Sequence, residues 1–268
     1  MSRISTVLEQ LSKQNKTALV PFVTAGDPNP GWTVGILKAL VESGADIIEL
    51  GVPFSDPMAD GPVIQKASER ALAHNVGLKD VLAMVKRFRE DNSVTPIVLM
   101  GYLNPVEVMG YDVFCKAAAE AGVDGVLTVD MPPEESADLV AALNQSGLDP
   151  IYLISPTSHQ ERIAKITSVA SGYLYYVSLK GVTGSNALDE QAVCNKIKEI
   201  RTHTDIPIAV GFGIKDAETA KKVSKCADAV IVGSALVNKV EQYSQDFGAI
   251  TTEITTLMSS IRQALDNE

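Results

Sequence analysis

The chain has 268 residues, a formal net charge of −10 and an apolar content of 46%. The acidic balance argues against a nucleic-acid-binding protein, because such proteins present a basic face to the phosphates. The apolar content is too high for a disordered chain and is typical of a globular protein with a packed core.

The positions of cysteine and histidine indicate neither a disulfide framework nor a metal site. Cys115, Cys194 and Cys226 are odd in number, far apart and in no CxxC pair, a pattern that fits a reducing compartment. The three histidines are also scattered, so no histidine-rich metal site is predicted.

The first 16 residues are predicted to form a short amphipathic helix. Apolar side chains recur there at helical spacing, at Ile4, Val7, Leu8 and Leu11. The segment lacks the long apolar stretch and cleavage site of a signal peptide. No apolar run reaches the roughly 18 residues that a membrane span needs. We therefore expect a soluble, cytoplasmic protein.

Short apolar runs alternate with helical patterns along the rest of the chain. Runs that are apolar almost throughout are typical of parallel strands covered on both faces. The predicted strands are 17–22, 46–52, 96–102, 125–131, 150–155, 173–178, 207–212 and 229–233. The predicted helices between them are 32–43, 78–90, 111–121, 134–145, 160–169, 190–202 and 216–225. Eight strands alternating with helices predict an α/β fold, a (β/α)8 TIM barrel.

The spacing of the strands predicts two enlarged connections. The intervals from 46 to 96 and from 173 to 207 are the long ones, so extended loops or extra helices should follow the second and sixth strands. A doubly wound open sheet is the alternative, but no GxGxxG fingerprint follows the first strand. No linker or change in composition divides the chain, so we expect one domain over 1–268.

Two carboxylates stand out in the segment IELGVPFSDPMADGP. Glu49 lies within an apolar strand, near the end where barrels place catalytic groups. Burial would raise its pKa and suit it to proton transfer near neutral pH, although an internal salt bridge or backbone hydrogen bonds would also explain it. Asp60, on the long loop that follows, should be more hydrated, and by itself would be an ordinary turn residue. Two carboxylates in different surroundings can divide proton-transfer roles.

Glycine clusters follow the last two predicted strands. The sequences are GFGI at 211–214 and GSA at 233–235, where a short helix should begin near Ser234. Barrels often bind phosphate at this place through backbone N–H groups, although simple turns would also use glycine. The segment 180–186 is polar and contains glycine, as expected of a mobile loop that closes over a site.

These motifs, in this order, resemble the tryptophan synthase alpha subunit family over essentially the whole chain. The matching segments are PFVTAGDP, IELGVPFSDPMADGP, GVTG, GFGI and GSALV. The resemblance implies a (β/α)8 enzyme that cleaves indole-3-glycerol phosphate to indole and glyceraldehyde 3-phosphate, late in tryptophan biosynthesis.

The resemblance also implies roles for individual residues. Glu49 would be the proton shuttle, Asp60 would bind the indole N–H, and Tyr175 would adjust the hydrogen bonding of Glu49. Substrate contacts would come from Phe22, Ile64, Met100, Leu127, Thr183, Gly184, Phe212, Gly213, Gly233 and Ser234. The apolar members of this set would otherwise be read as barrel core.

The family implies a partner and leaves rival functions open. Its members work as αββα heterotetramers with a beta subunit that holds pyridoxal phosphate, and no cofactor or metal is expected in this chain. The rivals are a stand-alone indole-releasing lyase, a barrel that only binds a phosphorylated ligand, and an aldolase that forms a Schiff base through Lys180.

Overall fold

The computed structural model describes residues 2–178, 190–211 and 213–267, and it contains a closed barrel of eight parallel strands. Each strand pairs with the next in the sequence, and β8 pairs with β1 to close the ring. The (β/α)8 prediction is confirmed. The strands are β1 (Ala18–Thr24), β2 (Ile48–Gly51), β3 (Ile97–Gly101), β4 (Gly125–Thr128), β5 (Asp149–Ile154), β6 (Leu174–Val177), β7 (Ile208–Gly211) and β8 (Ala229–Val232).

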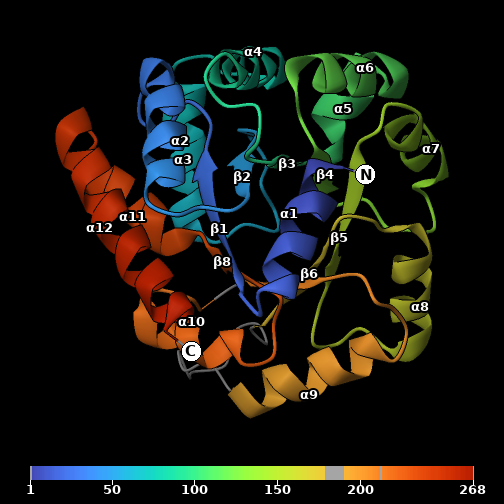
Figure 1. The fold of residues 1–268 in the computed structure, drawn as a ribbon. Coiled ribbons are helices and arrows are strands. Elements are labelled where there is room, and N and C mark those ends of the chain that lie inside the picture. Colours follow the sequence, from blue (N-terminus) through green and yellow to red (C-terminus); the bar gives the residue numbers. More distant parts are fainter. Residues whose placement is uncertain (1, 179–189, 212, 268) are drawn as a thin grey trace.

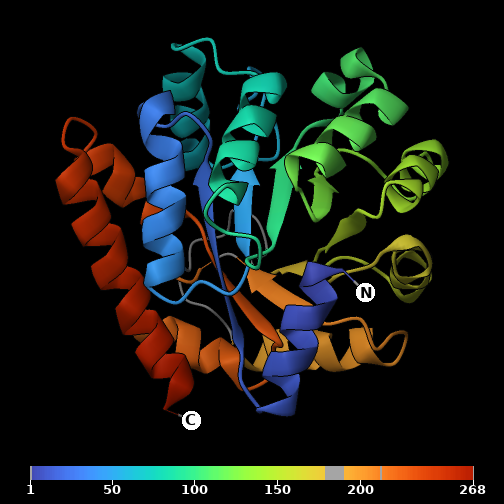
Figure 2. The same cartoon turned by 45° about the horizontal axis from the view of Figure 1, so that its top comes forward.

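Helices surround the strands, as Figures 1 and 2 show. Those that match predictions are α1 (Arg3–Lys13), α2 (Thr33–Glu42), α4 (Leu78–Arg89), α6 (Tyr111–Ala121), α7 (Ala137–Gln145), α8 (Gln160–Val169), α9 (Glu190–Arg201), α10 (Ala217–Ser224) and α11 (Ser234–Gln242). Additional helices are α3 (Pro62–Leu72), α5 (Leu103–Met109), α12 (Phe247–Asp266) and a 3-10 turn, η1 (Pro30–Trp32). Helix α3 occupies the enlarged connection predicted after the second strand. The other enlarged connection was predicted after the sixth strand, and its residues 179–189 lie outside the described ranges.

The barrel has two concentric apolar layers. The outer layer packs the helices against outward-facing strand residues such as Leu19, Leu50 and Leu99. The inner layer fills the barrel itself and includes Val20 and Val98. Because side chains alternate along a strand, each strand serves both layers. This explains why the runs in the sequence are apolar throughout.

The N-terminal helix closes one end of the barrel. Ile4 and Leu8 of α1 are buried with the inner-layer residues, and Figure 1 shows α1 lying across the middle of the barrel. The apolar spacing seen in the sequence is therefore the face that plugs this end.

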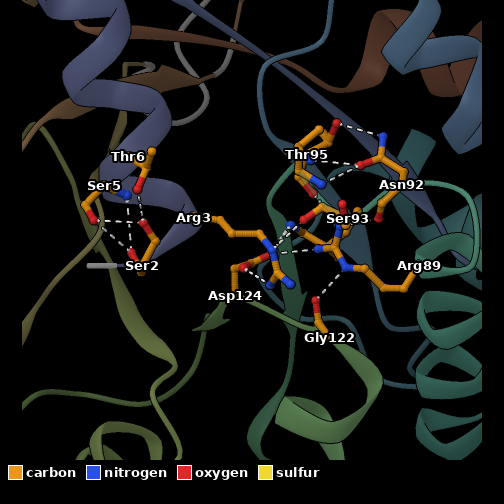
Figure 3. A network of polar contacts seen from close by, with 12 residues as sticks. Ser2, Arg3, Ser5, Thr6, Arg89, Asn92, Ser93, Thr95, Gly122 and Asp124 are labelled. Atoms are coloured by element: carbon orange, nitrogen blue, oxygen red, sulfur yellow. Dashed lines mark hydrogen bonds and ion pairs between the residues drawn. The ribbon is translucent and has the colours of Figure 1, made fainter.

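A buried aspartate fixes this closed end, as Figure 3 shows. Asp124, directly before β4, accepts a hydrogen bond from Arg3 of α1 at 2.8 Å and one from Arg89 of α4 at 2.7 Å. Its Oδ2 atom also accepts the backbone N–H of Ile97 at 2.8 Å. One carboxylate thus joins α1, α4 and β3.

The prediction that the cysteines form no disulfide is wrong. Cys194 of α9 and Cys226, just after α10, are joined with their Cα atoms 5.5 Å apart, while Cys115 is buried and free. The two helices are neighbours around the barrel, which spacing along the chain does not reveal. A salt bridge from Lys225 to Glu190, at 2.7 Å, joins the same two elements.

Within the described residues, no helix has both the length and the apolar character needed to cross a membrane.

Candidate functional site

A cavity of about 100 Å³ opens where the strands end at their carboxyl termini. The end of β3, the loop after β2 and the segments after β7 and β8 all contribute to it. Eight of the residues predicted from the sequence line it: Phe22, Asp60, Ile64, Met100, Tyr175, Gly213, Gly233 and Ser234. Gly61, Ile214 and Ile231 are the other described residues of the lining. These residues come from distant parts of the chain and meet only because the barrel closes.

Glu49 is completely buried on β2, beside this cavity wall. Its strand neighbours in register are Phe22 on β1 and Val98 on β3. Burial raises its pKa to about 7, and a hydrogen bond from Tyr173 opposes part of that rise. No cation pairs with Glu49 in the described part of the chain, so the salt-bridge explanation does not hold there.

The two carboxylate oxygens of Glu49 have different surroundings. The Tyr173 hydroxyl donates to Oε1 at 2.5 Å. Among the described residues, Oε2 has no hydrogen-bond partner. An unpaired buried carboxylate oxygen is costly, so this atom is the natural place for a proton or a reacting group.

Tyr173 is a residue that the sequence interpretation missed. Tyr173 and Tyr175 both lie in the inner layer of the barrel, because side chains two residues apart point to the same side of a strand. The interpretation assigned contact with Glu49 to Tyr175, whereas the hydrogen bond is made by Tyr173, one inward position nearer the barrel floor. Tyr175 instead lines the cavity. Burial raises its pKa, and the charges of Glu49 and Asp60 raise it further.

The packing of Tyr175 depends on a glycine in the adjacent strand. A Cβ atom at Gly211 would lie 2.1 Å from the Tyr175 hydroxyl. Any larger residue would push the tyrosine out of its place. The GFGI segment therefore has a packing role on β7 besides the anion-binding role considered from the sequence.

Asp60 is half-buried at the end of the loop that follows β2. Burial raises its pKa, and a hydrogen bond from Tyr102 opposes the rise. The Tyr102 hydroxyl donates to Asp60 Oδ2 at 3.1 Å and accepts the backbone N–H of Ala59 at 3.0 Å. Tyr102, which follows β3, was not identified from the sequence, although its place at the end of a strand was a usable signal.

The neighbouring carboxylate, Asp56, has a different environment. It is exposed and accepts a hydrogen bond from Ser55 at 2.5 Å. Asp56 is not among the described residues that line the cavity. The loop therefore turns one of its two aspartates toward the site.

The far end of the cavity is formed by backbone. Gly233 precedes α11 and Ser234 begins it, and no side chain of a described residue caps this helix. Gly213 has φ of 80°, a conformation that other residues rarely adopt. No lysine or arginine is among the described lining residues. Helix N-termini and glycine turns present N–H groups that bind anions.

Five predicted residues are not among the described residues that line this cavity. Glu49 lies behind the lining, next to Phe22 in the strand register. Leu127 is fully buried in the inner layer of the barrel with Val98 and Ile151, which favours the core interpretation for it. Thr183, Gly184 and Phe212 lie outside the described residues, as does Lys180.

Comparison with known proteins gives a consistent result. The model of the family described as "Tryptophan synthase alpha chain" matches residues 8–266. A tryptophan synthase alpha chain from Thioalkalivibrio sulfidiphilus is 60% identical over 266 residues, covering 99% of this chain and 100% of that protein. One from Methylococcus capsulatus is 56% identical, covering 99% and 100%.

Solved structures agree with the sequence matches. Tryptophan synthase subunit alpha from Legionella pneumophila superposes with a TM-score of 0.92 at 46% identity, covering all of both chains. A Mycobacterium tuberculosis tryptophan synthase chain gives 0.88 at 35% identity, with 98% of each chain covered.

Proposed function

The chain belongs to the tryptophan synthase alpha chain family, and from this premise we propose how its own residues cleave indole-3-glycerol phosphate. The enzyme is a carbon–carbon lyase that releases indole and glyceraldehyde 3-phosphate in tryptophan biosynthesis. The observation that carries the residue assignment is the buried Glu49, with a pKa of about 7 and an Oε2 atom that has no hydrogen-bond partner among the described residues. It lies beside a cavity lined partly by Gly213, Gly233 and Ser234.

Glu49 is the proton shuttle of this proposal. The bond between indole C3 and the side chain breaks only after C3 gains a proton, so that the ring leaves as neutral indole. The electrons of the broken bond return to the ring, and the substrate hydroxyl loses its proton to become the aldehyde. A group with a pKa near 7 can donate the first proton and accept the second at neutral pH.

Asp60 and Tyr175 act on the ring and on the shuttle. Asp60 accepts a hydrogen bond from the indole N–H and stabilises the positive charge that protonation at C3 creates. Tyr175 lies where the charges of both carboxylates reach it, which supports a role in positioning the substrate between them. Tyr102 holds Asp60 in place through its hydroxyl.

The remaining contacts divide between ring and phosphate. Apolar contacts to the indole come from Phe22, Ile64 and Met100, and the family resemblance adds Leu127 and Phe212. The phosphate binds the N–H groups around Gly213, Gly233 and Ser234, and the resemblance adds Gly184. Thr183 would meet Asp60 when the loop closes. The absence of cationic side chains among the described lining residues supports a phosphate site made of backbone.

Membership of the family implies a beta-subunit partner. We propose an αββα heterotetramer in the cytoplasm, with pyridoxal phosphate in the beta subunit. The pairing surface would include 53–57 and Pro132, on the side of the barrel from which indole must leave, and the family resemblance adds 180–184. We also propose that 1–268 is one domain, supported by the packing of α12 against α2 and α10.

Three substitutions test the assignment of the carboxylates. Glu49→Gln should reduce kcat for indole release by at least 10²-fold with little change in KM, since it removes proton transfer but keeps shape. Asp60→Asn should also lower kcat strongly. Asp56→Asn is the matched control and should retain activity. The measurement is indole release from indole-3-glycerol phosphate, with and without a beta subunit.

Two outcomes would contradict these assignments. Near-normal turnover by Glu49→Gln would remove the proton-shuttle role. A larger loss in Asp56→Asn than in Asp60→Asn would mean that the wrong loop carboxylate has been chosen.

A further inference from the structure

Two neighbouring helices, α3 and α11, each contribute residues to the lining of the cavity. Helix α3 begins beside Asp60 and carries Ile64, on the ring side of the proposed site, while α11 begins with Ser234 on the phosphate side. The helices pack against each other and both pack against β1. Their positions therefore determine how far apart the two ends of the cavity lie.

A small apolar cluster separate from the main cores joins these elements. Phe22 of β1, Ala67 of α3 and Val237 of α11 are buried together, with exposed fractions of 6%, 0% and 1%. Three side chains of this size fill the contact between the helices but have no directional preference. Val63, Ile64 and Met100 pack against the same cluster. Burial of apolar surface holds the helices together but is non-directional.

Arg70 supplies the missing directional contact at the other end of the two helices. It lies in the last turn of α3, where Nε and Nη2 donate to the two oxygens of Asp27 at 2.6 and 2.9 Å. Its third nitrogen, Nη1, lies 3.3 Å from an oxygen of Glu241, in the last turn of α11. One guanidinium thus joins α3, α11 and the loop after β1.

Asp27 is a rigid anchor for this arrangement. Its side chain is 2% exposed, and it follows β1, the strand that carries Phe22 into the cavity. The adjacent backbone is fixed as well, because the N–H of Gly26 donates to Thr33 Oγ1 at 2.9 Å. A two-point pair of arginine with a buried carboxylate fixes angle as well as distance, which a lysine cannot do.

We infer that Arg70 is a positioning residue that sets the spacing between the ring end and the phosphate end of the cavity. The inference rests on the function proposed above, because only a substrate that reaches both ends is sensitive to their separation. A misplacement of about 1 Å far from the chemistry can cost up to 10²-fold in rate. The affinity of a ligand that occupies one end alone should not change with the separation of the two ends.

The test compares a ligand that spans the cavity with ligands that do not. Arg70→Met keeps most of the side-chain volume but removes the hydrogen bonds. It should raise KM for indole-3-glycerol phosphate about 10-fold, while inhibition constants for indole and for inorganic phosphate change less than about 2-fold. Glu241→Gln, which loosens only the α11 contact, should raise KM about 3-fold. Arg70→Lys should recover part of the loss.

Arg201→Met is the matched control. Arg201 of α9 also contacts both oxygens of an aspartate, Asp228, at 2.8 Å, but this pair lies at the opposite end of the barrel from the cavity. The Arg201→Met substitution should lower the melting temperature. It should leave unchanged the KM for indole-3-glycerol phosphate and the inhibition constants for indole and phosphate. Melting temperatures of every variant are measured alongside, and kinetics are recorded well below them.

The outcomes separate this inference from the function on which it rests. If the wild-type chain releases no indole, the proposed function fails. If the wild type is active but Arg70→Met has a normal KM for the substrate, the positioning role is wrong. It is also wrong if the inhibition constants for indole and phosphate rise as much as that KM. Should Arg70→Met not fold, Glu241→Gln and Arg70→Lys give the same comparison.

Discussion

At the scale of single residues, the behaviour of Glu49 follows from the balance of burial and one hydrogen bond. Loss of water raises its pKa, because the charged form is the one that water stabilises. The Tyr173 hydroxyl donates to the same carboxylate and favours the charged form. The resulting pKa of about 7 allows both protonation states near neutral pH, as a proton shuttle requires.

Tyr173→Phe should therefore move the pH dependence of activity to higher pH. Without the hydroxyl, the charged form of Glu49 is less favoured, so the inflection of kcat/KM that belongs to Glu49 should rise by roughly one pH unit. The pH profile of indole release measures this. Tyr176→Phe is the control, since Tyr176 lies on β6, which begins directly after Tyr173 in the chain, but packs in the outer layer. An unchanged inflection in Tyr173→Phe would show that this hydrogen bond does not tune Glu49.

At the scale of elements, the closed end of the barrel repeats one arrangement. An aspartate just before a strand accepts a backbone N–H from a neighbouring strand and pairs with an arginine from a helix. This ties the start of a strand to the helical layer, at the end of the barrel away from the cavity. The sets are Asp46 with Leu19 and Arg262, Asp124 with Ile97 and Arg89, and Asp228 with Ile208 and Arg201.

Removing Asp124, the most buried of these three aspartates, should lower the stability of the fold substantially. Asp124→Ala leaves the guanidinium of Arg89 and the Ile97 N–H without their partner, and the free energy of unfolding should fall by about 3 to 5 kcal/mol. Arg3→Met removes a contact from a side chain that is 41% exposed, and should cost less than about 1 kcal/mol. Denaturant unfolding measures both. Equal losses would mean that Asp124 acts mainly through α1.

At the scale of the whole molecule, the net charge of −10 is compatible with a phosphorylated substrate. The charge argues against a nucleic-acid-binding face but leaves the backbone free to bind an anion. In the proposed site, glycine turns and the start of α11 provide the N–H groups. Global charge and local anion binding are thus independent properties of this chain.

The disulfide between α9 and the end of α10 should stabilise the molecule. It joins residues 32 apart in sequence. Because the disulfide restricts the unfolded chain, it should add roughly 3 to 4 kcal/mol to the free energy of unfolding. Reductant should lower the free energy of unfolding of the wild type by this amount and leave the double variant Cys194→Ser, Cys226→Ser unaffected. Denatured, unreduced protein should show one thiol, that of Cys115. Three thiols before reduction would contradict the pairing.

Much of the architecture could be predicted from local patterns. The apolar runs correspond to β1 to β8, because strands buried on both faces must be apolar on both, and the periodicity of 1–16 corresponds to α1. Helix α12 was missed although its buried residues recur every three or four positions. Its threonines are weak helix formers, and packing against α2, α10 and α11 overrides that preference.

The strands, their order and the two carboxylates of the IELGVPFSDPMADGP segment follow from local patterns, because they depend on neighbours along the chain. Long-range contacts establish which tyrosine contacts Glu49, that Tyr102 holds Asp60, which cysteines pair and how Arg70 joins two helices. Each of these depends on the height at which strands and helices meet after eight strands close into a ring. That register is a property of the closed barrel, and no single segment encodes it.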